Sequence, residues 1–181
     1  RRRHTRYISV TGVQTCALPI YLTVYDVGCG AGFDTLEIAR RLGAGGQVVG
    51  IDLSEALVSE ARSRVALAEI KVPATFKTGD ARTLTASGVV ARGSGDRLYM
   101  ERALQHIPRD GFFAVLGEFF AALKPGGIFV SVEPNWELFT LRSANIAMTR
   151  TIHHHWVDRF NHGNVAMNTP PAMRQAGFVD V

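Results

Sequence analysis

The run from Asp26 to Gly32, Asp-Val-Gly-Cys-Gly-Ala-Gly, has the spacing in this chain that points most directly to a ligand. It follows an apolar, β-type run at 21–25 and precedes a helical pattern at 33–42. A strand, a glycine-rich turn and a helix let backbone approach a nucleotide closely, because glycine has no Cβ and adopts positive φ. A dinucleotide fingerprint starting at Gly28 would need glycine at position 33. Phe33 stands there, so the spacing argues against a dinucleotide.

Asp52 is the second candidate for ligand binding. It ends the apolar run 47–51 and lies 24 residues after Gly28, the usual distance for one helix and one strand. A carboxylate at the end of this strand can accept hydrogen bonds from both hydroxyls of a ribose. Two other interpretations are an ordinary surface acid and an N-cap for the helix expected near Ser54. Together with the glycine loop, Asp52 favours ribose binding.

Strands and helices are expected to alternate along the chain. The strands are expected at 22–27, 47–51, 74–78, 97–100 and 128–133, and the helices at 33–42, 54–67, 110–123 and 170–176. This alternation predicts an α/β fold with a Rossmann-like, doubly wound, mostly parallel sheet and helices on both faces. The carboxyl ends of the strands then share one edge, which brings Asp52, Asp80 and Glu101 to the same side of the sheet.

Two segments interrupt this alternation. Proline and glycines at 124–127 predict a sharp turn before the fifth strand. The segment 135–168 contains Trp136 and Trp156 and is expected to be a helical insertion or lid. A further strand is expected to begin at 178–181, where the sequence stops. We therefore expect one domain over 21–181 that is incomplete at its C-terminus, with the edge strands truncated.

The order of these motifs resembles that of the class I S-adenosylmethionine-dependent methyltransferases, over residues 22–181. The acid and glycines of 26–32 resemble the first family motif, Gly79-Asp80-Ala81 resembles the third, and Leu123 to Val130 resembles a turn and strand common in the family. The resemblance implies S-adenosyl-L-methionine as the cofactor. It implies that Asp80 accepts from the adenine amino group, that the Ala81 backbone contacts the ring, and that Glu101 accepts from the α-ammonium group. The full set of implied cofactor-binding residues is Asp26, Gly28, Cys29, Gly30, Gly32, Asp52, Leu53, Asp80, Ala81, Glu101 and Arg102.

The resemblance implies methyl transfer to a small-molecule acceptor by in-line displacement. Nucleic-acid amino-methyltransferases carry an Asn/Asp-Pro-Pro-aromatic motif after the fourth strand, and Glu101-Arg102-Ala103-Leu104 stands there instead. The acceptor atom and the oligomeric state are not encoded in these motifs. A general base is needed only if the acceptor loses a proton, and His106 and Glu133 are the two candidates.

Histidine and cysteine patterns do not predict further chemistry. His153, His154 and His155 are adjacent, so they cannot share one face of a helix, and no metal site is expected. Cys29 is expected to turn into the core, and no neighbouring base or cation marks it as a nucleophile. Trp136 and Trp156 either stack on a substrate or form the aromatic core of a lid.

Composition places the chain among globular proteins. It has 181 residues, 46% hydrophobic residues and a formal net charge of +4, and no apolar run is long enough to span a bilayer. Residues 1–20 hold four arginines and no acid, and beyond them basic and acidic residues balance at 16 each. A neutral body argues against nucleic acid as a partner. Cys16 and Cys29 make no disulfide framework, which favours a reduced, cytoplasmic setting.

The first 20 residues resemble a translated sequencing adapter and are expected to be a non-native or disordered segment. Two alternatives to a methyltransferase stay open. One is an NAD-type oxidoreductase, which Asp52 suits but Phe33 and the lack of a Tyr-x-x-x-Lys pair oppose. The other is a non-catalytic, truncated fragment of a methyltransferase.

Overall fold

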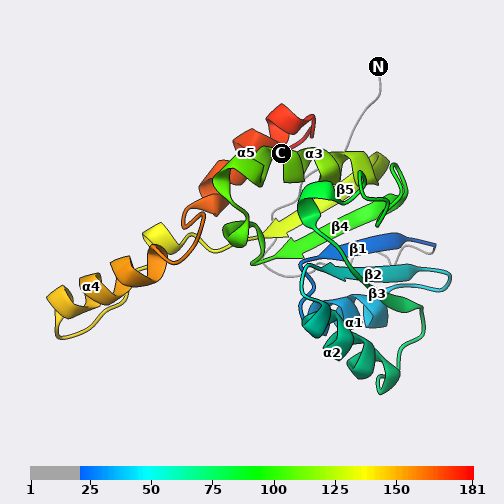
Figure 1. The fold of residues 1–181 in the computed structure, drawn as a ribbon, viewed down its shortest axis with the longest axis horizontal. Helices are drawn as coiled ribbons and strands as arrows, with labels where there is room; N and C mark the ends of the chain where they lie inside the picture. The colour runs from blue at the N-terminus through cyan, green and yellow to red at the C-terminus, as the bar shows by residue number, and fades with distance from the viewer. Residues whose placement is uncertain (1–20) are drawn as a thin grey trace.

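Five short runs rich in Val, Ile, Phe and Tyr form a parallel sheet in the computed structural model, which describes residues 21–181 (Figure 1). The strands are β1 (Thr23–Val27), β2 (Gln47–Asp52), β3 (Ala74–Thr78), β4 (Gly95–Glu101) and β5 (Leu123–Val132). The predictions for the segment 1–20 and for Cys16 fall outside the described residues.

The strand order, β3-β2-β1-β4-β5, fixes where a ligand can bind. From β1 the chain moves outward through β2 to β3, then returns to place β4 on the other side of β1. The loops that leave β1 and β4 therefore turn to opposite faces, and a sheet of this order binds ligands at that point, outside the carboxyl ends of its strands. This is the α/β, Rossmann-like arrangement that the sequence predicts. We call the edge at the ends of β1 and β4 the crevice.

Helices cover both faces of the sheet. Figure 1 shows α1 (Phe33–Arg41) and α2 (Glu55–Ala66) on one face, and α3 (Phe112–Ala122) and α5 (Val165–Ala176) on the other. The α3 side holds the larger core, centred on Leu98, Phe119, Phe129 and Met173, all fully buried. Ser54 caps α2 as expected, since its hydroxyl accepts from the Leu57 N–H at 3.4 Å. Four single turns of 3-10 helix complete the fold at Ala81–Thr83, Leu104–His106, Arg109–Gly111 and Trp136–Leu138.

The fifth strand starts earlier than the sequence predicts. Leu123 already pairs with Gly95, and the next aligned pair is Ile128 with Arg97, so the residues between are looped out. The turn expected at 124–127 is present, with Gly126 at φ +79, but it forms a bulge inside β5 instead of a connection before it. In a sequence, Pro-Gly-Gly predicts the end of an element. The pairing of Leu123 with Gly95 shows that here it lies inside a strand.

The last helix also starts earlier than expected. The sequence predicts a short helix over 170–176. The helix α5 begins at Val165 and contains both Pro170 and Pro171. Its buried residues include Val165, Thr169 and Met173, which lie at helical spacing on the face toward α3. Burial of that face outweighs the hydrogen bonds that the prolines remove.

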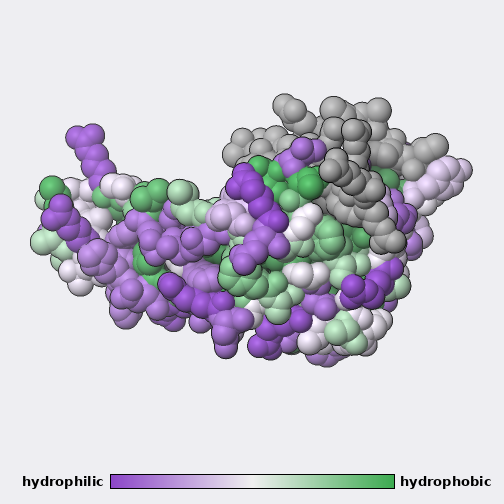
Figure 2. Space-filling view, turned by 90° about the horizontal axis from the view of Figure 1, so that it is seen from above, coloured by the Kyte–Doolittle hydropathy of each residue, from purple (hydrophilic) through white to green (hydrophobic). Residues whose placement is uncertain are grey.

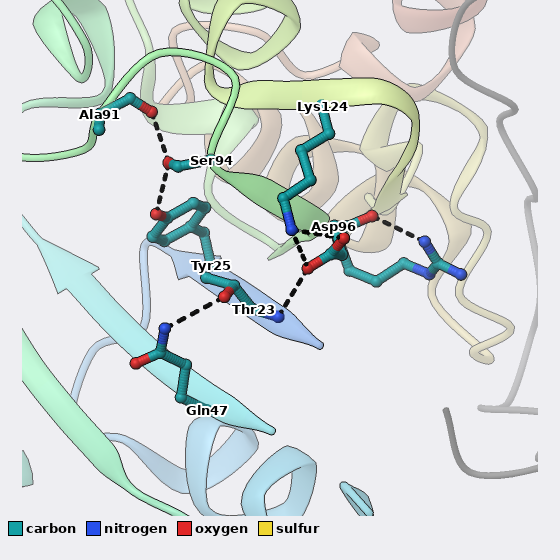
Figure 3. A network of polar contacts seen from close by, with 8 residues as sticks. Thr23, Tyr25, Gln47, Ala91, Ser94, Asp96 and Lys124 are labelled. Atoms are coloured by element: carbon teal, nitrogen blue, oxygen red, sulfur yellow. Dashed lines mark hydrogen bonds and ion pairs between the residues drawn. The ribbon is translucent and has the colours of Figure 1, made fainter. Parts of the chain in front are cut away.

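The amino ends of the strands are joined by a polar network, far from their carboxyl ends (Figure 3). Asp96 at the start of β4 accepts from the Thr23 N–H at 2.9 Å and from the Lys124 ammonium group at 2.8 Å. These hydrogen bonds hold the pKa of Asp96 below its ordinary value, against the opposing effect of burial. The network ties β1, β4 and the bulge of β5 together at the end of the sheet that faces away from the crevice.

The segment between β5 and α5 forms an arm that leaves the body of the domain. Its helix α4 (Ile146–Val157) has no buried residue, and it lies apart from the sheet in Figures 1 and 2. The base of the arm is aromatic: Trp136 stacks on Phe160 with ring centroids 5.3 Å apart, and Trp156 meets both rings edge-on. The segment 135–168 thus contains α4, and α5 already begins within it.

The expected strand at 178–181 is not formed. Val179 makes a single bridge, and Phe178 is buried against Phe120 and Phe129. Among residues 21–181 we find no helix that combines the length and the apolar character needed to cross a bilayer.

Met173→Ala tests whether α5 is part of the core. Met173 is fully buried, so its truncation should lower the free energy of unfolding by about 2–5 kcal/mol. Met167→Ala removes the same atoms from the same helix, but that side chain is 63% exposed. This control should change the free energy of unfolding by less than about 0.5 kcal/mol. Urea unfolding followed by circular dichroism measures both, and equal effects would show that α5 does not pack as described.

Candidate functional site

The candidate site lies at the carboxyl ends of β1, β2 and β4. The chain leaves β1 in a tight loop, Gly28 to Gly32, which we call the glycine loop. The N–H groups of Gly28 and Cys29 both donate to the Ile51 carbonyl, at 2.7 and 3.1 Å, so the loop is hydrogen-bonded to the end of β2. The loop is therefore a fixed part of the sheet edge.

Glycine is required at two of these positions for different reasons. Gly28 has φ +78, and a Cβ there would lie 2.6 Å from the Cβ of Ala103 in the loop after β4. Gly30 has φ +52, and a Cβ there would have no neighbour within 4 Å. Gly28 thus allows the two loops to touch, whereas Gly30 faces open space and needs glycine only for its positive φ.

Asp52 connects the glycine loop to the end of β2. Its Oδ2 accepts from the Gly30 N–H at 2.9 Å and its Oδ1 accepts from the Ser54 N–H at 2.9 Å. Each carboxylate oxygen has two acceptor positions, so one remains on each for a further donor. The Asp52 carboxylate can therefore accept from two more donors.

Asp26 lies below the glycine loop and is 2% exposed. The Thr35 hydroxyl donates to its Oδ2 at 2.5 Å, which ties the strand to the first turn of α1. Burial, with a smaller contribution from repulsion by Asp34, Glu101 and Asp52, raises the pKa of Asp26 to about 7, against the Thr35 hydrogen bond that lowers it. Asp26 is therefore a buried support beneath the glycine loop, bonded to the first turn of α1.

Cys29 points away from the open side of the loop, as expected. Its side chain packs with Val58, Ala61 and Phe76 under α2. Burial raises the pKa of the Cys29 thiol to about 12, and repulsion from Asp26 adds to this. A protonated, buried thiol is not a nucleophile.

Leu53, Asp80 and Ala81 form a second group of predicted residues, at the ends of β2 and β3. The Leu53 side chain is 68% exposed and offers an apolar surface beside Asp52. Asp80 accepts from the Arg82 N–H at 2.8 Å and pairs with the Arg82 guanidinium group at 2.6 Å. The hydrogen bonds from Arg82 lower the pKa of Asp80. They also occupy some of the acceptor positions of its carboxylate, which leaves fewer for a ligand.

Glu101 and Arg102 end β4 on the other side of the crevice. Glu101 accepts from the Tyr99 hydroxyl and lies 3.3 Å from the Arg102 guanidinium group. Arg102 has φ +52, a conformation that is uncommon for a side chain other than glycine. Its N–H donates to the Val132 carbonyl at 2.9 Å, which holds this turn in place.

Glu133, one of the two base candidates, anchors the loop after β4. Its Oε1 accepts from the N–H groups of Ala103 and Leu104 at 2.9 and 2.8 Å, and its Oε2 is buried without a partner. Burial raises the pKa of Glu133 to about 7, against the backbone hydrogen bonds that lower it. This geometry fits a support for the loop that touches Gly28 better than a base that meets an acceptor.

His106, the other base candidate, is exposed and belongs to the aromatic base of the arm. Its Nε2 accepts from the Gln105 amide at 3.3 Å, and its ring lies 5.7 Å from that of Phe160. Gln105 also accepts from the Trp136 indole N–H, so the loop after β4 and the arm form one polar and aromatic cluster. Trp136 and Trp156 belong to the core of this cluster.

The patterns in the sequence did not single out Asp34, which the structure brings into the site. It lies in the first turn of α1, where an acid is ordinary for a helix. Burial and the nearby Glu101 raise its pKa. In the part of the chain that the structure describes, no group of three His, Cys, Asp or Glu residues is arranged to hold a metal ion.

The fold, the crevice between β1 and β4 and the glycine loop tied to Asp52 together define a class I S-adenosylmethionine-dependent methyltransferase domain. A family model described as a methyltransferase domain matches residues 21–173, and the chain belongs to this family.

Curated relatives agree with this assignment. An uncharacterized 37.1 kDa protein in transposon TN4556 of Streptomyces fradiae is 31% identical over 155 residues, covering 84% of this chain and 42% of that protein. A ubiquinone biosynthesis O-methyltransferase of Bradyrhizobium is 34% identical over 122 residues, covering 66% of this chain and 44% of that enzyme. The chain thus spans less than half the length of these two relatives.

Solved structures share the fold. A SAM-dependent methyltransferase from Methanosarcina mazei is 27% identical with a TM-score of 0.55, covering 62% of this chain and 53% of that one. Phosphoethanolamine N-methyltransferase 2 of Haemonchus contortus, solved with S-adenosyl-L-methionine, has a TM-score of 0.67 at 20% identity, covering 91% of this chain and 34% of that one. At 20% identity the second likeness is one of fold alone.

Asp26→Asn tests the buried carboxyl. Because the pKa of Asp26 is about 7 in the folded protein and ordinarily near 3.8, the unfolded chain loses the proton first as pH rises. The wild type should therefore lose stability between about pH 4 and pH 7 relative to the variant, which cannot titrate there. Urea unfolding at pH 5 and pH 8 measures the difference.

Asp158→Asn, at an exposed carboxyl on the arm, is the control and should track the wild type at both pH values. An Asp26→Asn difference that stays constant from pH 5 to pH 8 would contradict the raised pKa of Asp26.

Proposed function

We propose that this chain binds S-adenosyl-L-methionine in the crevice between β1 and β4 and directs transfer of its methyl group to a small-molecule acceptor. The observation that carries the proposal is the Asp52 carboxylate, which holds the Gly30 N–H at 2.9 Å and keeps a free acceptor position on each oxygen. Two adjacent acceptors beside a glycine loop suit the two hydroxyls of a ribose.

Gly28, Cys29, Gly30 and Gly32 are proposed to provide the surface against which the cofactor lies. The open space at Gly30 supports this, since backbone there can be approached without a side chain in the way. The helix α1 begins at Phe33 with no side-chain cap on its N-terminus. Its free N–H groups and dipole suit the carboxylate of the methionine part.

Leu53, Asp80 and Ala81 are proposed to hold the adenine. The exposed Leu53 side chain offers an apolar surface for one face of the ring, at the end of the strand that carries Asp52. The backbone of Ala81 and one oxygen of Asp80 are proposed to meet the polar edge. Arg82 competes for Asp80, because its guanidinium group lies 2.6 Å from that carboxylate.

The carboxylates around the crevice suit the positive charges of the cofactor. Asp26, Asp34 and Glu101 interact through space, since each of the other two raises the pKa of Asp26 by repulsion. A sulfonium and an ammonium group bound nearby would relieve that repulsion. Glu101 is proposed to accept from the ammonium group, and Arg102 to hold Glu101 at 3.3 Å.

When bound, the cofactor supplies a methyl group already activated by the positive sulfur. The protein then has to align donor and acceptor and keep water away, and most of the rate comes from this positioning. Glu133 and His106 remain the candidates for a base. The bonds of Glu133 to Ala103 and Leu104 favour a role in holding the loop after β4.

A small-molecule acceptor is the narrower part of the proposal. Basic and acidic residues are equal in number beyond residue 20, so this part of the chain lacks the excess of positive charge that a nucleic-acid partner would favour. Two curated relatives have small molecules in their names, a ubiquinone-biosynthesis O-methyltransferase and a demethylmenaquinone methyltransferase. A cytoplasmic location is part of the same proposal, since Cys29 is a free thiol.

Thermal unfolding with two ligands separates this proposal from a nicotinamide enzyme. S-adenosylhomocysteine should raise the unfolding midpoint of the 181-residue chain, because a ligand that binds only the folded state stabilises it by mass action. NADH at the same concentration should leave it unchanged. A shift with NADH alone would favour the oxidoreductase, and a broad transition without a cooperative step would favour the non-catalytic fragment.

Asp52→Asn tests the proposed ribose contact. The variant turns one acceptor into an N–H₂ donor, which should weaken binding of S-adenosylhomocysteine by at least about tenfold in calorimetry. Asp158→Asn removes an exposed carboxyl at the end of α4 in the arm and should bind like the wild type. Unchanged affinity in Asp52→Asn would rule out the ribose role of Asp52.

A further inference from the structure

One carbonyl group of the glycine loop is hydrogen-bonded to a side chain of the neighbouring helix α2. The Cys29 carbonyl accepts from the Gly32 N–H at 2.9 Å, and the Gly32 carbonyl accepts from the Leu36 N–H at 3.1 Å, both within six residues of the loop. The Ala31 carbonyl between them accepts instead from Arg64 Nε on α2, at 3.0 Å. A side chain from the neighbouring helix thus fixes the peptide group between Ala31 and Gly32.

Arg64 is held in place by two further contacts. Its Nη2 pairs with Glu60 one turn earlier on α2, at 2.6 Å. Its guanidinium plane covers the ring of Phe33, with Cζ 3.8 Å from the ring centroid. Phe33 is the residue directly after the glycine loop, and it is still 64% exposed with Arg64 in place. The planar guanidinium group makes all three contacts at once, which a lysine ammonium group cannot do.

We propose that Arg64, together with Phe33, is a positioning residue that clamps the glycine loop from outside and so sets the affinity for the cofactor. This inference rests on the proposed function. Gly28, Gly30 and Gly32 all have positive φ, and glycine backbone is the least restricted by sterics, so the loop depends on hydrogen bonds to keep one shape. Ile51 and Asp52 hold its first half through the N–H groups of Gly28, Cys29 and Gly30. The clamp holds its second half through the Ala31 carbonyl.

The clamp is separate from the packing that holds α2 on the sheet. The buried residues of α2 are Val58 and Ala61, which pack with Cys29 and Phe76. Arg64 is only partly exposed and is not among these buried residues; it lies beside a groove of about 520 Å³ between α1 and α2 that Leu36 and Ser63 also line. Loss of its guanidinium group should therefore change the loop and leave the fold intact.

Arg64→Met removes the guanidinium group and keeps an apolar stem. We expect binding of S-adenosylhomocysteine to weaken by about tenfold in calorimetry, while the unfolding midpoint without ligand changes little. Arg64→Lys keeps the charge and should recover only part of the affinity. Arg40→Met is the matched control: Arg40 lines the same groove and pairs with Glu37 at 3.6 Å, but it does not touch the loop, so affinity should be unchanged.

Amide hydrogen exchange tests the clamp without any cofactor. The N–H groups of Gly30 and Gly32 are hydrogen-bonded to Asp52 and Cys29, so their exchange reports opening of the loop. Exchange at these amides should be faster in Arg64→Met than in the wild type and in Arg40→Met. Equal exchange in all three proteins would overturn the clamp even if the chain binds S-adenosylhomocysteine.

The two failures can be told apart. A wild type that does not bind S-adenosylhomocysteine contradicts the proposed function, and the exchange experiment still decides the clamp. A wild type that binds, with Arg64→Met binding equally well, contradicts the clamp alone. Weaker binding in both Arg64→Met and Arg40→Met would assign the effect to surface charge and would also overturn the clamp.

Discussion

The contact between the loops that follow β1 and β4 is the constraint on which the rest of the structure depends. A Cβ at Gly28 would lie 2.6 Å from the Cβ of Ala103, so the two loops meet with no side chain between them. This closeness is possible because β1 and β4 are neighbouring strands whose carboxyl ends lie at the same edge of the sheet.

Each of the two loops is held by a side chain from a neighbouring element. Glu133, after β5, accepts from two N–H groups of the loop after β4, and Asp52, at the end of β2, accepts from the Gly30 N–H. In both cases a carboxylate accepts from backbone N–H groups that have no backbone carbonyl partner in the irregular segment. Irregular backbone at a sheet edge can keep one shape only if its polar groups are matched in this way.

The same supports place several acids in a small volume, and this has an energetic cost. Asp26 and Glu133 both have a pKa of about 7 because burial disfavours their charge. Removing charged groups from water is unfavourable unless partners compensate fully, and the unpartnered Oε2 of Glu133 shows that compensation is incomplete. A cationic ligand is the natural complement of such a site.

Much of this could be predicted from the sequence, since the determining signals are local. The glycine spacing, the acid at the end of β2 and the strand at Ala74–Thr78 need no distant information. The bulge in β5 and the early start of α5 were mispredicted because each depends on contacts far along the chain, with Gly95 and with α3. Arg64 was missed for the same reason: nothing near it in the sequence indicates that it reaches Ala31, 33 residues earlier.

The arm that carries α4 has a consequence for how this domain can change over generations. Since α4 buries no side chain, a substitution there leaves the packed interior intact. Selection for a stable fold therefore constrains the sequence of α4 only weakly. Its base, by contrast, is joined to the loop after β4 through Trp136 and Gln105. Variation in this arm could therefore diversify the molecules that the domain meets while the core that holds the crevice is inherited unchanged.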